Sequence, residues 1–172
     1  RAPRIRNGQS PQEVYTHELL HAMTSIAIDK SPLVRQRIER LFENVQTTLE
    51  LTYGKGQGYK VFLPPGTGPT KLATAAEITM AQKQYEQAFE AKEEHRLHEF
   101  MAYANTNATL SNFMKNNPLS KRTGMYERML DMIKTIVDTV KDLFGMSVYR
   151  PENEAQLSEA IAITEQLIAI QN

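Results

Sequence analysis

The residues best suited to chemistry form the run HELLH at positions 17–21. Its two histidines are four residues apart, and side chains at that spacing project from the same face of an α-helix, one turn apart. Two imidazoles placed in this way can bind one tetrahedral zinc ion. Glu18 lies about 100° around the helix from His17, close enough to take a proton from an activated water without ligating the metal. The run therefore predicts Zn²⁺ ligands at His17 and His21 and a general base at Glu18.

A third ligand is expected from a second window, EEHRLHEFMAYANTN at residues 93–107, which holds the other two histidines of the chain. If this window is helical, His95, Glu99 and Tyr103 follow one another on one side of the helix. Glu99 is the first choice of ligand, His95 the second and His98 the third. Either window alone is also typical of a solvated helix face, and it is their pairing that favours a metal site. The opposite side carries an apolar stripe expected to face the core: Leu97, Phe100, Met101 and Ala104.

The two windows together, HELLHAM and HEFMAYANTNATL, resemble the zincin metallopeptidases whose third ligand is a glutamate. They are most similar to the anthrax lethal factor-like group and to metallopeptidase-like domains of very large phage and mobile-element polyproteins. Those families carry HExxH on one helix and an E-F-x-A-E-A-type segment, whose first Glu binds zinc, on a second. The resemblance covers residues 10–27 and 95–114. It implies that His17, His21 and Glu99 hold Zn²⁺ and that Glu18 is the general base.

The sequence departs from this family pattern at two positions. The second Glu of the family segment, which supports a ligand histidine, is replaced by Tyr103, and such supporting groups are worth roughly 10–100-fold in affinity or activity. The tyrosine that lethal factor-like enzymes place seven residues before the ligand, to stabilise the oxyanion, is replaced by Lys92. Tyr103 is the first candidate to supply that catalytic hydroxyl, with Tyr53 and Tyr59 as alternatives.

The function implied by the resemblance is a zinc-dependent endopeptidase that hydrolyses a peptide or protein substrate. One alternative is a catalytically inactive zincin-like module that associates with other segments of a phage virion or another large polyprotein. A second alternative is a metal-dependent hydrolase acting on a non-peptide amide. The resemblance fits a virion-associated or a cytoplasmic chain, and the sequence does not decide between the two.

Composition limits the classes of partner and of site that we expect. The 172 residues include 20 Lys or Arg and 20 Asp or Glu, so the formal net charge is zero, and we expect neither a nucleic-acid nor a membrane partner. Cysteine is absent, which excludes thiolate zinc sites and a cysteine nucleophile. We see no run of 18 apolar residues and no signal peptide. Because the chain starts at Arg1, we expect residues 1–172 to be a single domain from a larger polypeptide.

The HExxH run is expected inside a helix that begins after Ser10 and ends near Ile28. Ser10 and Glu13 form an S-x-x-E capping box, and Pro11 suits the first helical position. Ser31-Pro32 repeats the signal and opens a second helix to about Leu51. Apolar residues of the first helix are expected to be buried: Leu19, Leu20, Met23, Ile26 and Ala27.

The remainder of the chain is also expected to be mostly helical. Residues 52–70 are rich in glycine and proline and indicate a long loop around one short strand, Tyr59–Leu63. Helical composition resumes over residues 72–104 with a break near Lys92, ends and restarts at 105–112, and stops at a loop over 116–124. Two last helices are expected at 125–144 and 151–170. The predicted fold class is therefore mainly α and zincin-like, with five to six helices and a small β element in the 52–70 region.

Overall fold

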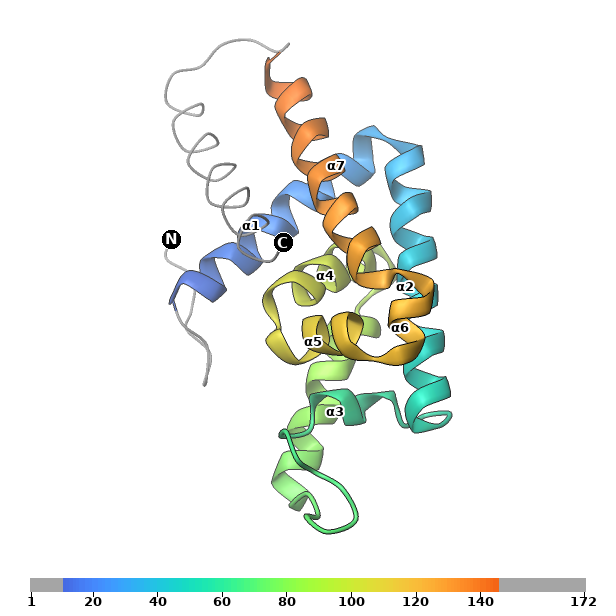
Figure 1. Cartoon of the computed structure of the whole chain (residues 1–172). Coiled ribbons are helices and arrows are strands. Elements are labelled where there is room, and N and C mark those ends of the chain that lie inside the picture. The colour runs from blue at the N-terminus through green and yellow to red at the C-terminus, as the bar shows by residue number, and fades with distance from the viewer. Residues whose placement is uncertain (1–10, 146–172) are drawn as a thin grey trace.

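The computed structural model describes residues 11–145, and these residues form a helical domain (Figure 1). The mainly α class is therefore confirmed, but residues 11–145 alone contain seven α-helices, so the expected number of five to six is wrong. Within this range no strand is present, and extended pairing is limited to one isolated bridge between Gly68 and Lys71. The elements follow in the order α1 (Pro11–Lys30), α2 (Pro32–Tyr53), the 3₁₀ helix η1 (Gly58–Phe62), α3 (Ala75–Phe89), α4 (Glu93–Thr106), α5 (Ala108–Asn116), α6 (Pro118–Thr123) and α7 (Met125–Gly145).

The starts of α2 and α3 are fixed by side-chain caps. The Ser31 hydroxyl accepts from the backbone N–H of Val34 at 3.2 Å, with Pro32 in the first turn, as the sequence predicts. Thr74 and Glu77 form a reciprocal capping box at the start of α3. These caps supply partners for backbone N–H groups that a helix start leaves unpaired.

After α4, two short helices each begin at an asparagine cap. Asn107 ends α4 and caps α5 by accepting from Leu110 N–H at 3.0 Å, which confirms the predicted end and restart. Asn117 caps α6 in the same way, and α6 ends at Gly124 in the left-handed conformation. The prediction of a loop over 116–124 is therefore wrong. The Asn-Pro and Gly signals there are the two ends of a short helix.

The expected strand Tyr59–Leu63 is also wrong, because the chain forms the 3₁₀ helix η1 there. Gly58, Val61 and Phe62 are buried, and their spacing matches a helical turn rather than alternation along a strand. Gly58 fits closely against α3, since a Cβ at this position would lie 2.9 Å from Cε2 of Tyr85. Packing on α3 therefore overrides the β preference of this apolar run.

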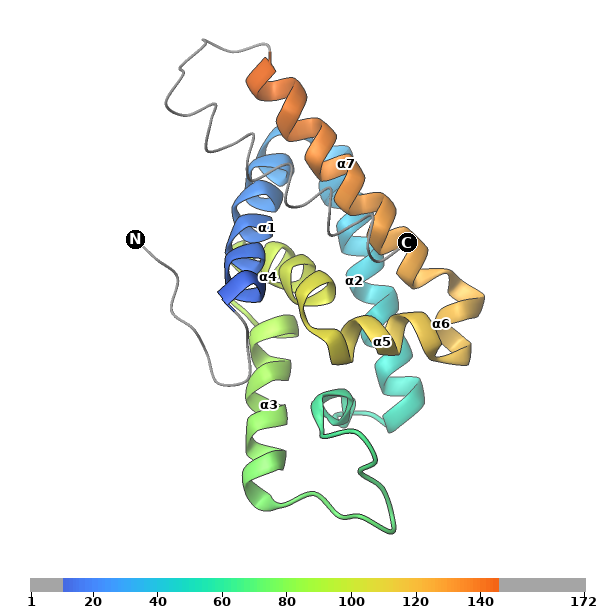
Figure 2. The same cartoon turned by 60° about the vertical axis from the view of Figure 1, so that its left-hand side comes forward.

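The core is built where α1 and α4 lie along each other and α2 and α7 close over them, an arrangement visible in both views (Figures 1 and 2). Phe100 of α4 is fully buried and meets the ring of Phe42 edge-on at 5.2 Å between ring centroids. The predicted stripe of α4 is buried throughout. In α1, Leu20, Met23 and Ala27 are buried, while Leu19 and Ile26 are partly buried against the same core.

Two sequence-based expectations lie outside the described residues: the Ser10 cap and the helix over 151–170. Across residues 11–145, none of the helices combines the length and the apolar character needed to cross a bilayer.

Candidate metal centre

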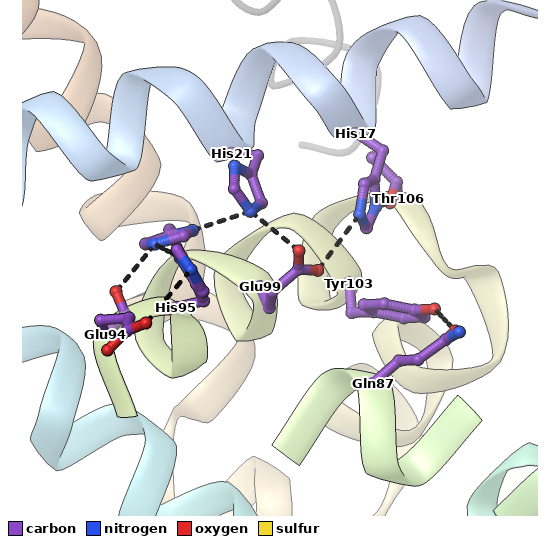
Figure 3. Close-up of polar contacts among 9 residues, drawn as sticks. His17, His21, Gln87, Glu94, His95, Glu99, Tyr103 and Thr106 are labelled. Atoms are coloured by element: carbon purple, nitrogen blue, oxygen red, sulfur yellow. Dashed lines mark hydrogen bonds and ion pairs between the residues drawn. The ribbon is translucent and has the colours of Figure 1, made fainter. Parts of the chain in front are cut away.

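The interface between α1 and α4 brings together the three residues expected to bind metal (Figure 3). Oε1 of Glu99 lies 2.8 Å from Nε2 of His21, and Oε2 lies 3.6 Å from Nε2 of His17. The helices run antiparallel here, because the earlier histidine of α1 meets the later part of α4. Because His17 and His21 are four residues apart on one face of α1, the Glu99 carboxylate of α4 lies between them.

The site is half-buried rather than sealed. The side chain of His17 is 7% exposed, whereas those of His21 and Glu99 are 28% and 27% exposed. Glu18 is exposed on the next position of α1, and its charge acts on His21. Solvent therefore reaches the edge of the site formed by His21 and Glu99, and Glu18 lies on α1 with His21.

Glu99 and His21 each stabilise the charged form of the other. Burial by itself would raise the pKa of Glu99, but hydrogen bonds from His17 and His21 hold that pKa well below its ordinary value. The hydrogen bond to Glu99 raises the pKa of His21 above its ordinary value, against the opposing effect of burial. The carboxylate is consequently ionised throughout the neutral range.

The two remaining histidines extend this polar contact along α4. Nδ1 of His98 lies 2.8 Å from Nε2 of His21, and Nε2 of His98 lies 3.0 Å from the carbonyl oxygen of Glu94. A carbonyl only accepts, so Nε2 of His98 carries the proton, and its Nδ1 is an acceptor that shares the single Nε2 proton of His21 with Glu99. Burial and the neighbouring His21 lower the pKa of His98. His95 follows at 3.3 Å from His98, which places all four histidines in one row.

The donor atoms of His17, His21 and Glu99 form a row, with Glu99 in the middle. Within residues 11–145, no group of three or more histidine, cysteine or acidic side chains is already arranged to hold a metal ion. Two ligands of one tetrahedral zinc lie roughly 3.3 Å apart. The contact of 2.8 Å to His21 is shorter than this and the contact of 3.6 Å to His17 is longer. Metal binding therefore requires the Glu99 carboxylate to move off His21.

Tyr103, the first candidate for the catalytic hydroxyl, is buried beside the site but turned away from it. Its ring meets His17 edge-on at 5.0 Å, and its hydroxyl donates to Oε1 of Gln87 on α3 (Figure 3). The two alternative tyrosines lie elsewhere: Tyr53 packs on Phe113, and the hydroxyl of Tyr59 donates to Gln57. The structure thus brings the predicted ligands together but points no predicted tyrosine hydroxyl at them.

A hollow of about 340 Å³ lies against the His98 end of the row. Ile28 and Leu97 give it an apolar wall, and Ser25, one turn after His21 on α1, also lines it. Charged side chains line the rest: Asp29, Arg35, Glu93 and Glu94. Because His98 both lines this hollow and contacts His21, the hollow adjoins the candidate metal ligands.

Two residues of the site were not predicted in the roles that the structure gives them. Thr106 contacts His17 from the last position of α4, with its Oγ1 3.0 Å from Nδ1 of the imidazole. His98, considered only as a third-choice ligand, is buried against His21. The sequence does hold a signal for Thr106, because it follows Glu99 by seven residues, or about two helical turns, and so shares its face.

Comparison with family models, with curated proteins and with solved structures found no match to this chain.

Proposed function

We propose that this chain is a zinc-dependent endopeptidase with a zincin-like pairing of an HExxH helix and a glutamate helix. The observation that carries the proposal is the meeting of His17, His21 and Glu99, which come from distant parts of the sequence. Both histidines face the carboxylate through Nε2, and two imidazoles with one carboxylate are the ligand set of a common class of catalytic zinc sites.

The donor set suits zinc in charge as well as in number. Zinc, when bound, polarises a peptide carbonyl and lowers the pKa of water to about 7. The ionised Glu99 supplies the negative charge that favours a divalent cation between two imidazoles. Its partly exposed side chain has the freedom to leave His21, which the contact of 2.8 Å requires.

Glu18 is the proposed general base. It is exposed beside the open edge of the site, and it lies between the two histidines in sequence. From this position its carboxylate takes the proton of the attacking water and returns it to the leaving amine. The hydroxyl of Tyr103 would have to leave Gln87 to act on an oxyanion, so the proposal rests on the three ligands and Glu18.

The hollow beside His98 gives a substrate side chain a place next to the proposed ligands. Its volume, about 340 Å³, lies at the lower end of the range typical of ligand pockets. Its apolar wall of Ile28 and Leu97 offers contact to an aliphatic stem, and its charged residues offer polar contact near the opening. We therefore expect side-chain selectivity at a residue close to the cleaved bond.

The test begins with metal content, measured by mass spectrometry on protein purified without a histidine tag or chelator. We expect about one zinc per chain and chelator-sensitive cleavage of a peptide library. Glu18→Gln is expected to keep the zinc and to lose hydrolysis, because an amide does not accept the proton. Glu43→Gln, an exposed glutamate of α2 outside the site, is the matched control. Hydrolysis retained by Glu18→Gln would contradict the mechanism.

A second candidate function is a non-catalytic zincin-like module of a larger assembly. The contact that favours it is the one between His98 and His21, because Nδ1 of a buried imidazole already occupies the neighbourhood of a ligand nitrogen at 2.8 Å. This candidate predicts stable association with other segments of the same polyprotein and no cleavage. Metal-dependent cleavage of peptides by the isolated chain would exclude it.

A further inference from the structure

Thr106 occupies the far end of the polar row, where α4 ends. Its Oγ1 lies 3.0 Å from Nδ1 of His17, on the opposite side of the imidazole from Glu99 (Figure 3). The same Oγ1 lies 2.6 Å from the carbonyl oxygen of Ala102, one turn earlier on α4. One hydroxyl thus stands between a ring nitrogen and a backbone carbonyl.

The protons in these two contacts can be assigned from chemistry alone. A threonine hydroxyl has a single proton, and a carbonyl oxygen only accepts. The proton of Thr106 is therefore donated to Ala102. Since the hydroxyl has no second proton to give, the contact with His17 requires that Nδ1 carry the hydrogen and donate it to Thr106. Neutral His17 is consequently held as the tautomer that has a bare Nε2.

We propose that Thr106 is a positioning residue that presents Nε2 of His17 as a metal ligand. In this tautomer Nε2 carries no proton and faces Oε2 of Glu99 at 3.6 Å, so a metal ion would take the place of the proton in the hydrogen bond between His17 and Glu99. This role rests on the proposed zinc site. It does not require Thr106 to touch the metal or the substrate.

The placement of Thr106 also accounts for a departure noted in the sequence. In the families that the chain resembles, a glutamate one turn after the ligand supports a ligand histidine, and Tyr103 stands at that position here. Tyr103 meets His17 through its ring edge and directs its hydroxyl to Gln87. Thr106, one turn further along α4, supplies the hydrogen-bond acceptor that His17 needs.

The tautomer can be measured on the wild-type protein without metal. Long-range ¹H–¹⁵N correlation spectra of histidine-labelled protein distinguish a protonated Nδ1 from a protonated Nε2. At a pH where His17 is neutral we expect the Nδ1–H pattern, and an Nε2–H pattern would overturn the proposal. This arm needs no variant, so it is independent of any effect of substitution on folding.

The functional arm compares Thr106→Val with Thr106→Ser. Valine keeps the shape of threonine without the acceptor, whereas serine keeps the hydroxyl. Zinc affinity, measured by competition with a chromophoric chelator, should fall roughly 10–100-fold in the valine variant and stay near wild type in the serine variant. Wild-type affinity in Thr106→Val would overturn this role alone. A wild-type protein that binds no zinc would overturn the proposed function and this role with it.

Discussion

The carboxylate of Glu99 accepts a hydrogen bond from His21 across the interface between α1 and α4, at 2.8 Å. This contact joins the two sequence windows that hold all four histidines, together with the contacts of His98 to His21 and of Thr106 to His17. Glu99 would have to move out of this contact for Glu99 and His21 to bind one metal ion. The metal-free site is therefore held together by a charged hydrogen bond that zinc would replace.

Removing the charge of Glu99 should abolish zinc binding. In Glu99→Gln the neutral amide is a poor ligand, so we expect zinc affinity to fall by more than the roughly 10–100-fold typical of groups that only support a ligand. Metal content of the purified protein, followed by zinc titration, measures this. Glu94→Gln is the matched control on the same helix, because that carboxylate lies outside the proposed ligand set and pairs with the exposed His95 at 3.7 Å. Equal zinc content in Glu99→Gln and wild type would show that Glu99 is not a ligand.

The contribution of this pair to stability should depend on pH. The pKa of Glu99 is lowered from 4.5, so its contribution is present above 4.5 and is lost as the pH falls through the lowered value. The pKa of His21 is raised from 6.5, so its contribution is present below 6.5 and is lost as the pH rises through the raised value. The pair therefore stabilises the metal-free fold most between pH 4.5 and 6.5.

The measurement is the difference in unfolding temperature between wild type and Glu99→Gln, both in chelator. Taking the difference reduces the opposite effect of His98, whose pKa is lowered mainly by burial, although Glu99 also acts on it, and whose lowered pKa makes the fold less stable on acidification. We expect the difference to shrink from mildly acidic to alkaline pH, while zinc affinity rises over the same range because zinc must displace a proton from His21. A difference independent of pH would contradict the assigned pair.

The aromatic cluster behind the site should carry much of the stability of α4. Phe100 is fully buried between Phe42 and Phe89, at 5.2 and 5.6 Å between ring centroids. Phe100→Ala is expected to lower the free energy of unfolding by about 3–5 kcal/mol through the cavity it leaves. Phe100→Leu, which keeps most of the volume, should cost clearly less. Urea unfolding curves measure both, and a loss below about 1 kcal/mol in the alanine variant would show that the cavity collapses.

The Asn107 cap next to the site should contribute to stability independently of the candidate metal ligands. The side chain of Asn107 accepts from Leu110 N–H at 3.0 Å and starts α5 directly after Thr106. Asn107→Ala should lower the free energy of unfolding by about 1 kcal/mol, and Asn107→Asp should restore most of that loss. Equilibrium unfolding gives both values. If aspartate and alanine were equally destabilising, the hydrogen bond would not be the source of the effect.

Much of the helical layout follows from local signals. Ser31-Pro32, the break near Lys92 and the polar run around Asn107 each predict a boundary because caps act over three or four residues. Side-chain spacing places His17 and His21 on one helix face and Glu99 on the polar face of another. That these two faces meet is expected from the pairing of the windows and from the family resemblance, because spacing alone does not say how distant helices cross.

The features that the sequence does not predict all depend on such crossings. The run Tyr59–Leu63 has the composition of a strand, yet the packing of Val61 and Phe62 against α3 makes it a 3₁₀ turn. Nothing local distinguishes a buried His98 from the exposed His95 three residues earlier. The role of Thr106 depends on the antiparallel placement of α1, which alone decides that a terminal hydroxyl meets His17.

The segment between η1 and α3 has a consequence for fragment complementation. Most of it is exposed, with Leu72 81% exposed, and it separates α1 and α2 from α3 and α4. A chain cut at Gly66 would divide the candidate ligands, leaving His17 and His21 in one piece and Glu99 in the other. Reassembly of the two pieces would then be promoted by zinc, so that a split version of this protein would report the metal by whether its halves rejoin.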